Sequence, residues 1–156
     1  NARAVNAGKT IDSVETYAFQ GGIFDGLSPE YQAIYLDSGL TLLEISMGLA
    51  EPDPEVAEAA QLQEEMLEGM FETWKNRDPE GFSAVYGKEA VINSDDELNS
   101  KLFTERDPGM IAAAAEYLET EGENTFLLAV GAGHMADPGG IVSGLRELGY
   151  TVELVP

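Results

Sequence analysis

The sequence between Thr125 and Val155 reads TFLLAVGAGHMADPGGIVSGLRELGYTVELV and carries the clearest structural signal in the chain. Its continuous apolar run, Phe126–Val130, is typical of a strand that is covered on both faces. Gly140–Leu148 has the pattern of an amphipathic helix, and Thr151–Val155 reads as a second strand. Parallel strands joined through a helix form a right-handed unit. We therefore expect a terminal parallel βαβ unit over residues 125–155.

A glycine turn lies between the first strand and the helix of this unit and carries the only histidine of the chain, in the order Gly131-Ala132-Gly133-His134. Turns at this place present side chains to a crevice at the carboxyl edge of a sheet, and glycine lets the backbone approach a ligand closely. His134 is thus a candidate metal ligand or general base, with a structural loop histidine as the alternative. A catalytic metal takes about three protein ligands, so the others would be carboxylates or residues outside this sequence.

Five of the seven prolines follow a residue that commonly caps a helix N-terminus, which predicts five helix starts. The five pairs are Ser28-Pro29, Asp53-Pro54, Asp78-Pro79, Asp107-Pro108 and Asp137-Pro138. After Asp53, apolar residues recur at helical spacing from Val56 to Trp74. We expect this stripe to pack in the core or against another helix.

The remaining pattern predicts few strands. Thr10–Glu15 alternates weakly between apolar and polar residues and is predicted as a short first strand. A helix-rich insert, from residue 28 to about residue 121, separates it from the terminal unit. We therefore expect an α/β (α+β-like) fold in one domain, residues 1–156, with a small incomplete sheet covered by helices.

Composition limits the classes of partner. The chain has 156 residues, and 29 acidic residues against 8 basic ones give a net charge of −21. Such a surface repels phosphate backbones and anionic lipid, which argues against nucleic acid and membrane-surface binding. No apolar run approaches the roughly 18–20 residues of a membrane span, so no membrane insertion by this segment is expected. The absence of cysteine excludes disulfides, thiolate metal sites and cysteine nucleophiles.

Two segments of the sequence are similar to phosphate-binding motifs. Gly8-Lys9-Thr10 lacks the earlier glycine of a P-loop, because Arg3 stands there. The turn at 131–136 formally fits the dinucleotide fingerprint G-x-G-x-x-A, with Gly131 and Gly133 as cofactor-binding residues and Glu153 at 20 positions after Gly133. Against this reading, Asp137-Pro138 delays the helix start beyond the place where its amides would meet a pyrophosphate. A dinucleotide-binding unit is kept as an alternative.

Two further polar residues are candidates for the same site. Glu15 ends the predicted first strand and is either a metal-binding acid or a solvated strand-end carboxylate. Arg106 is one of only eight basic residues and directly precedes Asp107. Its guanidinium is suited to clamp a carboxylate or a substrate oxygen, with a surface ion pair as the alternative.

Taken together, these segments resemble the TraB/GumN family, which is related to the Tiki proteases. The resembling segments are Gly8-Lys9, Val14-Glu15-Thr16 with Gln20, Phe24-Asp25-Gly26-Leu27, Leu102 with Glu105-Arg106, Leu128–His134 and Leu148–Val152. Members of this family have two G-x-x-H turns, of which Gly131–His134 matches the second. The chain therefore resembles the C-terminal portion of a member.

The resemblance implies a metal-dependent hydrolase, most naturally a peptidase, with His134 and Glu15 as metal ligands and His134, Glu15 and Arg106 as catalytic residues. It further implies a divalent ion (manganese, cobalt or zinc) and a site completed by the upstream half of the same protein or by a second copy. A peptide substrate and an extracytoplasmic location, secreted or lipoprotein-anchored, are expected on the same grounds. The alternative is a non-catalytic ligand- or peptide-binding module on the same fold.

Overall fold

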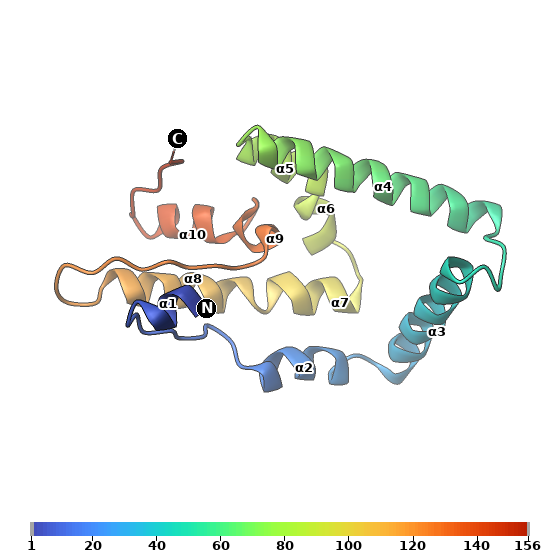
Figure 1. Ribbon diagram of the computed structural model, residues 1–156, viewed down its shortest axis with the longest axis horizontal. Coiled ribbons are helices and arrows are strands. Elements are labelled where there is room, and N and C mark those ends of the chain that lie inside the picture. The colour runs from blue at the N-terminus through green and yellow to red at the C-terminus, as the bar shows by residue number, and fades with distance from the viewer. Residues whose placement is uncertain (1, 156) are drawn as a thin grey trace.

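The computed structural model describes residues 2–155, and within that range helices are the only regular secondary structure (Figure 1). The helices are α1 (Ala2–Asn6), α2 (Tyr17–Asp25), α3 (Pro29–Ser46), α4 (Pro54–Lys75), α5 (Pro79–Tyr86), α6 (Lys88–Ile92), α7 (Glu97–Asn99), the π-helical turn η1 (Ser100–Thr104), α8 (Asp107–Leu118), α9 (Ala132–Met135) and α10 (Ile141–Glu147).

The expected α/β fold with a terminal βαβ unit is wrong for the described residues. Its helix is present as α10, but residues 10–15, 126–130 and 151–155 are unpaired coil segments. A strand needs hydrogen bonds to a neighbouring strand, and none of these three segments pairs with another. The segment 126–130 runs back along α8 toward α9 (Figure 1). Only one of its faces is covered there, since Leu128 and Val130 pack on the core whereas Leu127 is 94% exposed.

Three of the five predicted helix starts are confirmed by their capping bonds. The side chains of Ser28, Asp53 and Asp78 accept hydrogen bonds from backbone N–H groups three positions on, at the starts of α3, α4 and α5. At the fourth, Asp107 is itself the first residue of α8.

The fifth predicted start is wrong. The Asp137-Pro138 peptide bond is cis, and α10 begins only at Ile141, after Gly140. Gly139, which has a φ of 69°, lies in the turn between them. A left-handed backbone conformation here does not continue into a helix, so the capping pair precedes a turn instead.

The buried core lies between α8 and α10. Its centre is Met110, Ala114 and Ile141, and partly buried apolar side chains pack around it: Val14, Ile111, Leu128, Val130, Met135 and Leu145. Gly144 lets the two helices approach closely, because a Cβ at this position would lie 2.4 Å from Cδ1 of Ile111. The core therefore fixes the relative position of α8 and the segment that includes α9 and α10.

Helices α3 and α4 contribute no buried residue to this core. The apolar stripe of α4 was expected to be packed, yet Leu67, Phe71 and Trp74 are each more than half exposed. The C-terminal half of α4 contacts α5, where the position of a Cβ on Gly69 would lie 3.0 Å from Val85. The expectation for residues 56–74 thus holds only where α5 covers the helix.

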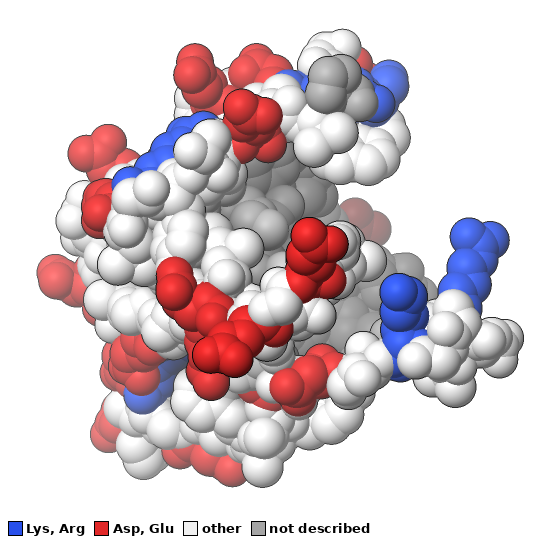
Figure 2. Space-filling model, turned by 90° about the vertical axis from the view of Figure 1, so that its left-hand side faces the viewer, with Lys and Arg blue, Asp and Glu red and all other residues white. Residues whose placement is uncertain are grey.

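Acidic side chains are spread over the surface, with few basic side chains between them on the face shown in Figure 2. Among the described helices, none combines the length and the apolar composition that a membrane crossing requires.

Candidate functional site

His134 is held by a carboxylate from the start of α8. Its Nδ1 lies 2.7 Å from Oδ1 of Asp107, and the side chain is only 11% exposed. Its other nitrogen, Nε2, forms no hydrogen bond within residues 2–155. Every fully buried side-chain nitrogen or oxygen in that range has a partner, so Nε2 is not fully buried, whereas Nδ1 is held by Asp107.

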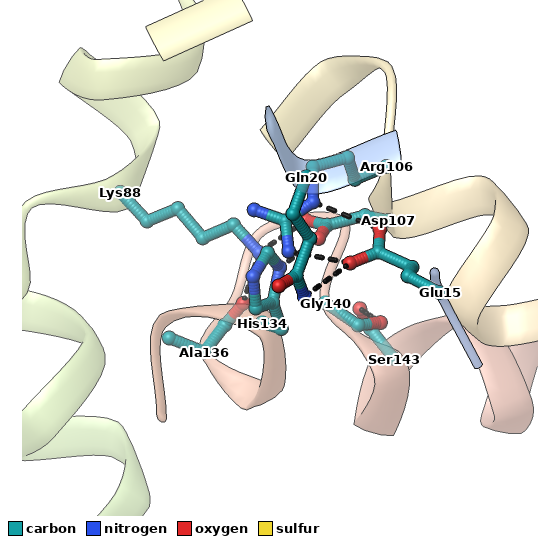
Figure 3. A network of polar contacts seen from close by, with 9 residues as sticks. All are labelled: Glu15, Gln20, Lys88, Arg106, Asp107, His134, Ala136, Gly140 and Ser143. Atoms are coloured by element: carbon teal, nitrogen blue, oxygen red, sulfur yellow. Dashed lines mark hydrogen bonds and ion pairs between the residues drawn. The ribbon is translucent and has the colours of Figure 1, made fainter. Parts of the chain in front are cut away.

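Lys88, the first residue of α6, lies behind this carboxylate and has no exposed surface. Its Nζ donates to Oδ2 of Asp107 at 2.7 Å and to the backbone oxygen of Ala136 at 2.9 Å (Figure 3). The same ammonium lies 5.4 Å from the centroid of the Phe103 ring. That ring in turn packs on the imidazole, with 5.4 Å between the Phe103 and His134 ring centroids.

A second ion pair lies beside the first. Arg106 donates from Nε to Oε1 of Glu15 at 2.9 Å and from Nη2 to Oε2 at 2.7 Å. Gln20 donates to the same Oε2 at 3.3 Å (Figure 3). The hydrogen bonds from Arg106 lower the pKa of the Glu15 carboxyl, and the same contact raises the pKa of Arg106. Both side chains are about nine-tenths covered.

The start of α8 brings these groups together. Arg106 and Asp107 are consecutive, so one side chain reaches Glu15 of the N-terminal coil and the other reaches His134 of α9. The three residues proposed from the sequence, Glu15, Arg106 and His134, thus lie in one cluster (Figure 3). Sequence reasoning gave Asp107 only a helix-capping role and did not single out Lys88. No local pattern marks Lys88, since its partners lie 19 and 48 positions away.

The two glycines of the turn differ in their surroundings. A Cβ on Gly133 would lie 2.8 Å from Oη of Tyr86 and 3.1 Å from the Phe103 ring, whereas one on Gly131 would meet only Cδ2 of His134, at 3.7 Å. Packing against the two rings therefore accounts for a glycine at 133. Cofactor binding by these glycines remains a prediction.

The donor groups in this arrangement do not by themselves fit a metal site. Among residues 2–155 no group of three or more histidine, aspartate or glutamate side chains is placed to hold an ion. Both oxygens of Glu15 accept hydrogen bonds from Arg106, and His134 offers one free nitrogen. Metal binding by Glu15 and His134 remains a prediction that requires donors beyond this cluster.

A match to a known family model identifies the family of this chain. The model of the TraB/PrgY/gumN family matches residues 1–154. The chain belongs to this family. The resemblance found on the glycine turn and the segments around it is thereby confirmed over nearly the whole sequence. No match was found among curated proteins or among solved structures.

Proposed function

We propose that this TraB/PrgY/gumN protein supplies the imidazole half of a hydrolytic site, with His134 as the proton acceptor. The observation that carries the proposal is the contact of Asp107 with Nδ1 at 2.7 Å, combined with an Nε2 that has no hydrogen-bond partner among the described residues and is not fully buried. A carboxylate on one imidazole nitrogen orients the ring and leaves the other nitrogen to accept a proton.

The reaction proposed is hydrolysis of a peptide bond. Water attacks the carbonyl carbon and gives its proton to Nε2 of His134, and the resulting imidazolium returns that proton to the leaving amine as the C–N bond breaks. Asp107 holds the ring throughout and stabilises the imidazolium. The net charge of −21 disfavours anionic substrates, so neutral or basic peptides are the substrate class proposed.

The remaining groups of the site are proposed to come from the upstream half of the same protein or from a second copy. When bound, a divalent ion would supply a more acidic water and polarise the carbonyl oxygen. An ion bound at Nε2 of His134 would occupy the electron pair that otherwise accepts the proton, so in that form the ion would replace His134 as the group that activates water. An extracytoplasmic location belongs to the same proposal and is supported by the family resemblance alone.

The test is cleavage of a library of neutral and basic peptides, with new termini detected by mass spectrometry, by the chain alone and within any longer natural protein that contains it. Each reaction is run with and without manganese, cobalt or zinc. We expect His134→Ala to lower the rate about 100-fold or more, the usual contribution of a general base. Asp95→Asn, which removes an exposed carboxylate outside the cluster, is the matched control and keeps the rate.

The possible outcomes distinguish a metal-dependent hydrolase, a metal-independent hydrolase and a binding module. Cleavage that needs an ion supports the metal-dependent form, and cleavage without one supports His134 acting on water directly. A rate unchanged by His134→Ala, or no cleavage by either form of the protein, contradicts the proposal. Peptide binding without cleavage supports the alternative of a non-catalytic binding module.

A further inference from the structure

Lys88 is the one side chain of the described residues that is both large and fully buried. Burying an ammonium group is unfavourable unless a charge and hydrogen bonds compensate it. Here Asp107 supplies the charge and Ala136 supplies a second acceptor. Both partners hold His134 as well: Asp107 contacts the imidazole directly, and Ala136 follows α9, the short helix that carries the ring.

The charges of this buried group balance when the imidazole is neutral. Lys88 carries one positive charge and Asp107 one negative charge, and Asp107 divides its oxygens between them: Oδ2 accepts from Lys88 and Oδ1 faces Nδ1 of His134. In that state a carboxylate can only accept a hydrogen bond, so Nδ1 must donate. The proton of the neutral ring then resides on Nδ1, and Nε2 keeps its free electron pair.

Without Lys88, Oδ2 of Asp107 loses its partner, and the carboxylate is no longer held in place against Nδ1 of His134. The hydrogen bond made by one ring nitrogen decides which nitrogen carries the proton. A neutral ring that loses this bond returns to the tautomer of free histidine, with its hydrogen on Nε2, and the outward nitrogen then has no free electron pair.

We propose that Lys88 is a positioning residue that selects the Nδ1–H tautomer of His134 and so makes the outward Nε2 an acceptor. The Lys88 ammonium also lies over the Phe103 ring, and the Phe103 ring packs on the imidazole. Lys88 therefore helps to fix the plane of the His134 ring through Phe103. The role of this selection in hydrolysis rests on the function proposed above. The tautomer itself does not, because it is a property of the ring before any substrate binds.

The experiment is nitrogen-15 NMR of the whole chain with labelled histidine. Since His134 is the only histidine, its two ring nitrogens give the whole spectrum, and their different couplings to the carbon-bound ring hydrogens tell Nδ1 from Nε2. Spectra are recorded where the neutral ring predominates, at a pH above which the signals no longer move. Lys88→Met removes the charge, Lys88→Gln removes the charge but keeps an amide donor for Ala136, and Lys75→Met on exposed α4 is the matched control.

In the wild type and in Lys75→Met we expect a protonated Nδ1 and an unprotonated Nε2, although free histidine favours the opposite tautomer. In either Lys88 variant that retains the helical circular dichroism of the wild type, we expect Nε2 to become the mainly protonated nitrogen. Three results overturn the proposal: a wild type with its hydrogen on Nε2, folded Lys88 variants with an unchanged tautomer, or loss of the fold in both variants, which would make Lys88 a residue of folding alone. Failure of the peptide cleavage assay overturns the proposed function and leaves the tautomer result standing.

Discussion

Arg106 donates through Nε and Nη2 to the two carboxylate oxygens of Glu15, and this paired contact ties the N-terminal coil to the start of α8 across 91 positions. Because both side chains are about nine-tenths covered, breaking the contact leaves a charge with little water around it. The geometry uses two donors of one guanidinium, which lysine cannot reproduce. The pair therefore holds Glu15 beside His134 by charge and by shape.

Arg106→Met is expected to lower the free energy of unfolding by about 3 kcal/mol, the cost of removing one partner from a buried ion pair. Arg106→Lys keeps the charge but loses one charge-assisted hydrogen bond, and should cost about 1.5 kcal/mol. Urea denaturation at neutral pH measures both. Arg3→Met, on the exposed surface of α1, is the control and should leave the midpoint unchanged. Equal midpoints for wild type and Arg106→Met would show that the pair adds nothing to stability.

A second pair of contacts should make stability depend on pH. Tyr31 of α3 donates from its hydroxyl to Oδ2 of Asp96 at 2.6 Å, and Asn99 donates from its backbone to the other oxygen. The hydrogen bond from Tyr31 is the main reason that the pKa of Asp96 is lowered, and the same contact raises the pKa of Tyr31 to about 12. The sequence separation between α3 and α7 makes this contact a link between distant parts of the chain.

The directions of these two pKa shifts determine how the stability of the fold changes with pH. A lowered carboxyl pKa adds stability that is present above the unfolded value of about 3.9 and is lost as pH falls through that value to the lower native one. A raised tyrosine pKa adds stability that is present below about 10 and is lost as pH rises toward 12. We expect Tyr31→Phe to cost about 1 kcal/mol near neutral pH and progressively less as the pH falls below the unfolded carboxyl value of about 3.9.

The measurement is urea denaturation of Tyr31→Phe and wild type at a series of pH values. Tyr17→Phe removes a hydroxyl from a side chain that is 94% exposed and serves as the matched control. A cost of Tyr31→Phe that stays constant from neutral to acid pH would contradict the assignment of the hydrogen bond to ionised Asp96.

The helices that were predicted correctly are those whose sequence signals lie within a few residues of one another. Ser28, Asp53 and Asp78 cap helices because the capping bond joins residues three positions apart, and that spacing is visible in the sequence. The helix between Gly140 and Leu148 was predicted for the same reason, and it ends before Gly149, whose φ is 95°. Asp137-Pro138 carries the same capping signal, but the glycines that follow it place a turn there.

The sheet was predicted wrongly and the buried ion network was missed because both depend on which distant residues come into contact. The apolar run at 126–130 is extended, and Leu128 and Val130 do face the core, but a periodicity does not say whether a partner strand lies alongside. Lys88 and Asp107 meet across 19 positions, and Asp107 and His134 across 27, so no window of sequence contains the contact. The residues of the cluster that were proposed came from local signals and from the family resemblance: the glycine turn for His134, the end of a predicted strand for Glu15, and the scarcity of basic residues for Arg106.

The glycine turn offers a last prediction, which separates packing from cofactor binding. Gly133→Ala places a methyl group 2.8 Å from Oη of Tyr86 and 3.1 Å from the ring of Phe103. Overpacking of this kind costs about 1–3 kcal/mol. Gly131→Ala meets only the His134 ring, at 3.7 Å, and its φ of −60° suits alanine, so it should cost little.

Thermal denaturation of the two variants, each beside the wild type, measures this difference, and Gly131→Ala is the control because it lies in the same turn. A dinucleotide site of the G-x-G-x-x-A type would need both glycines, so a dinucleotide would raise the melting temperature of the wild type and of neither variant. Packing predicts instead that Gly133→Ala alone melts earlier and that adding a dinucleotide changes nothing. Equal destabilisation by the two substitutions would contradict the close contact of Gly133 with Tyr86 and Phe103, and with it the packing that presses the Phe103 ring onto His134.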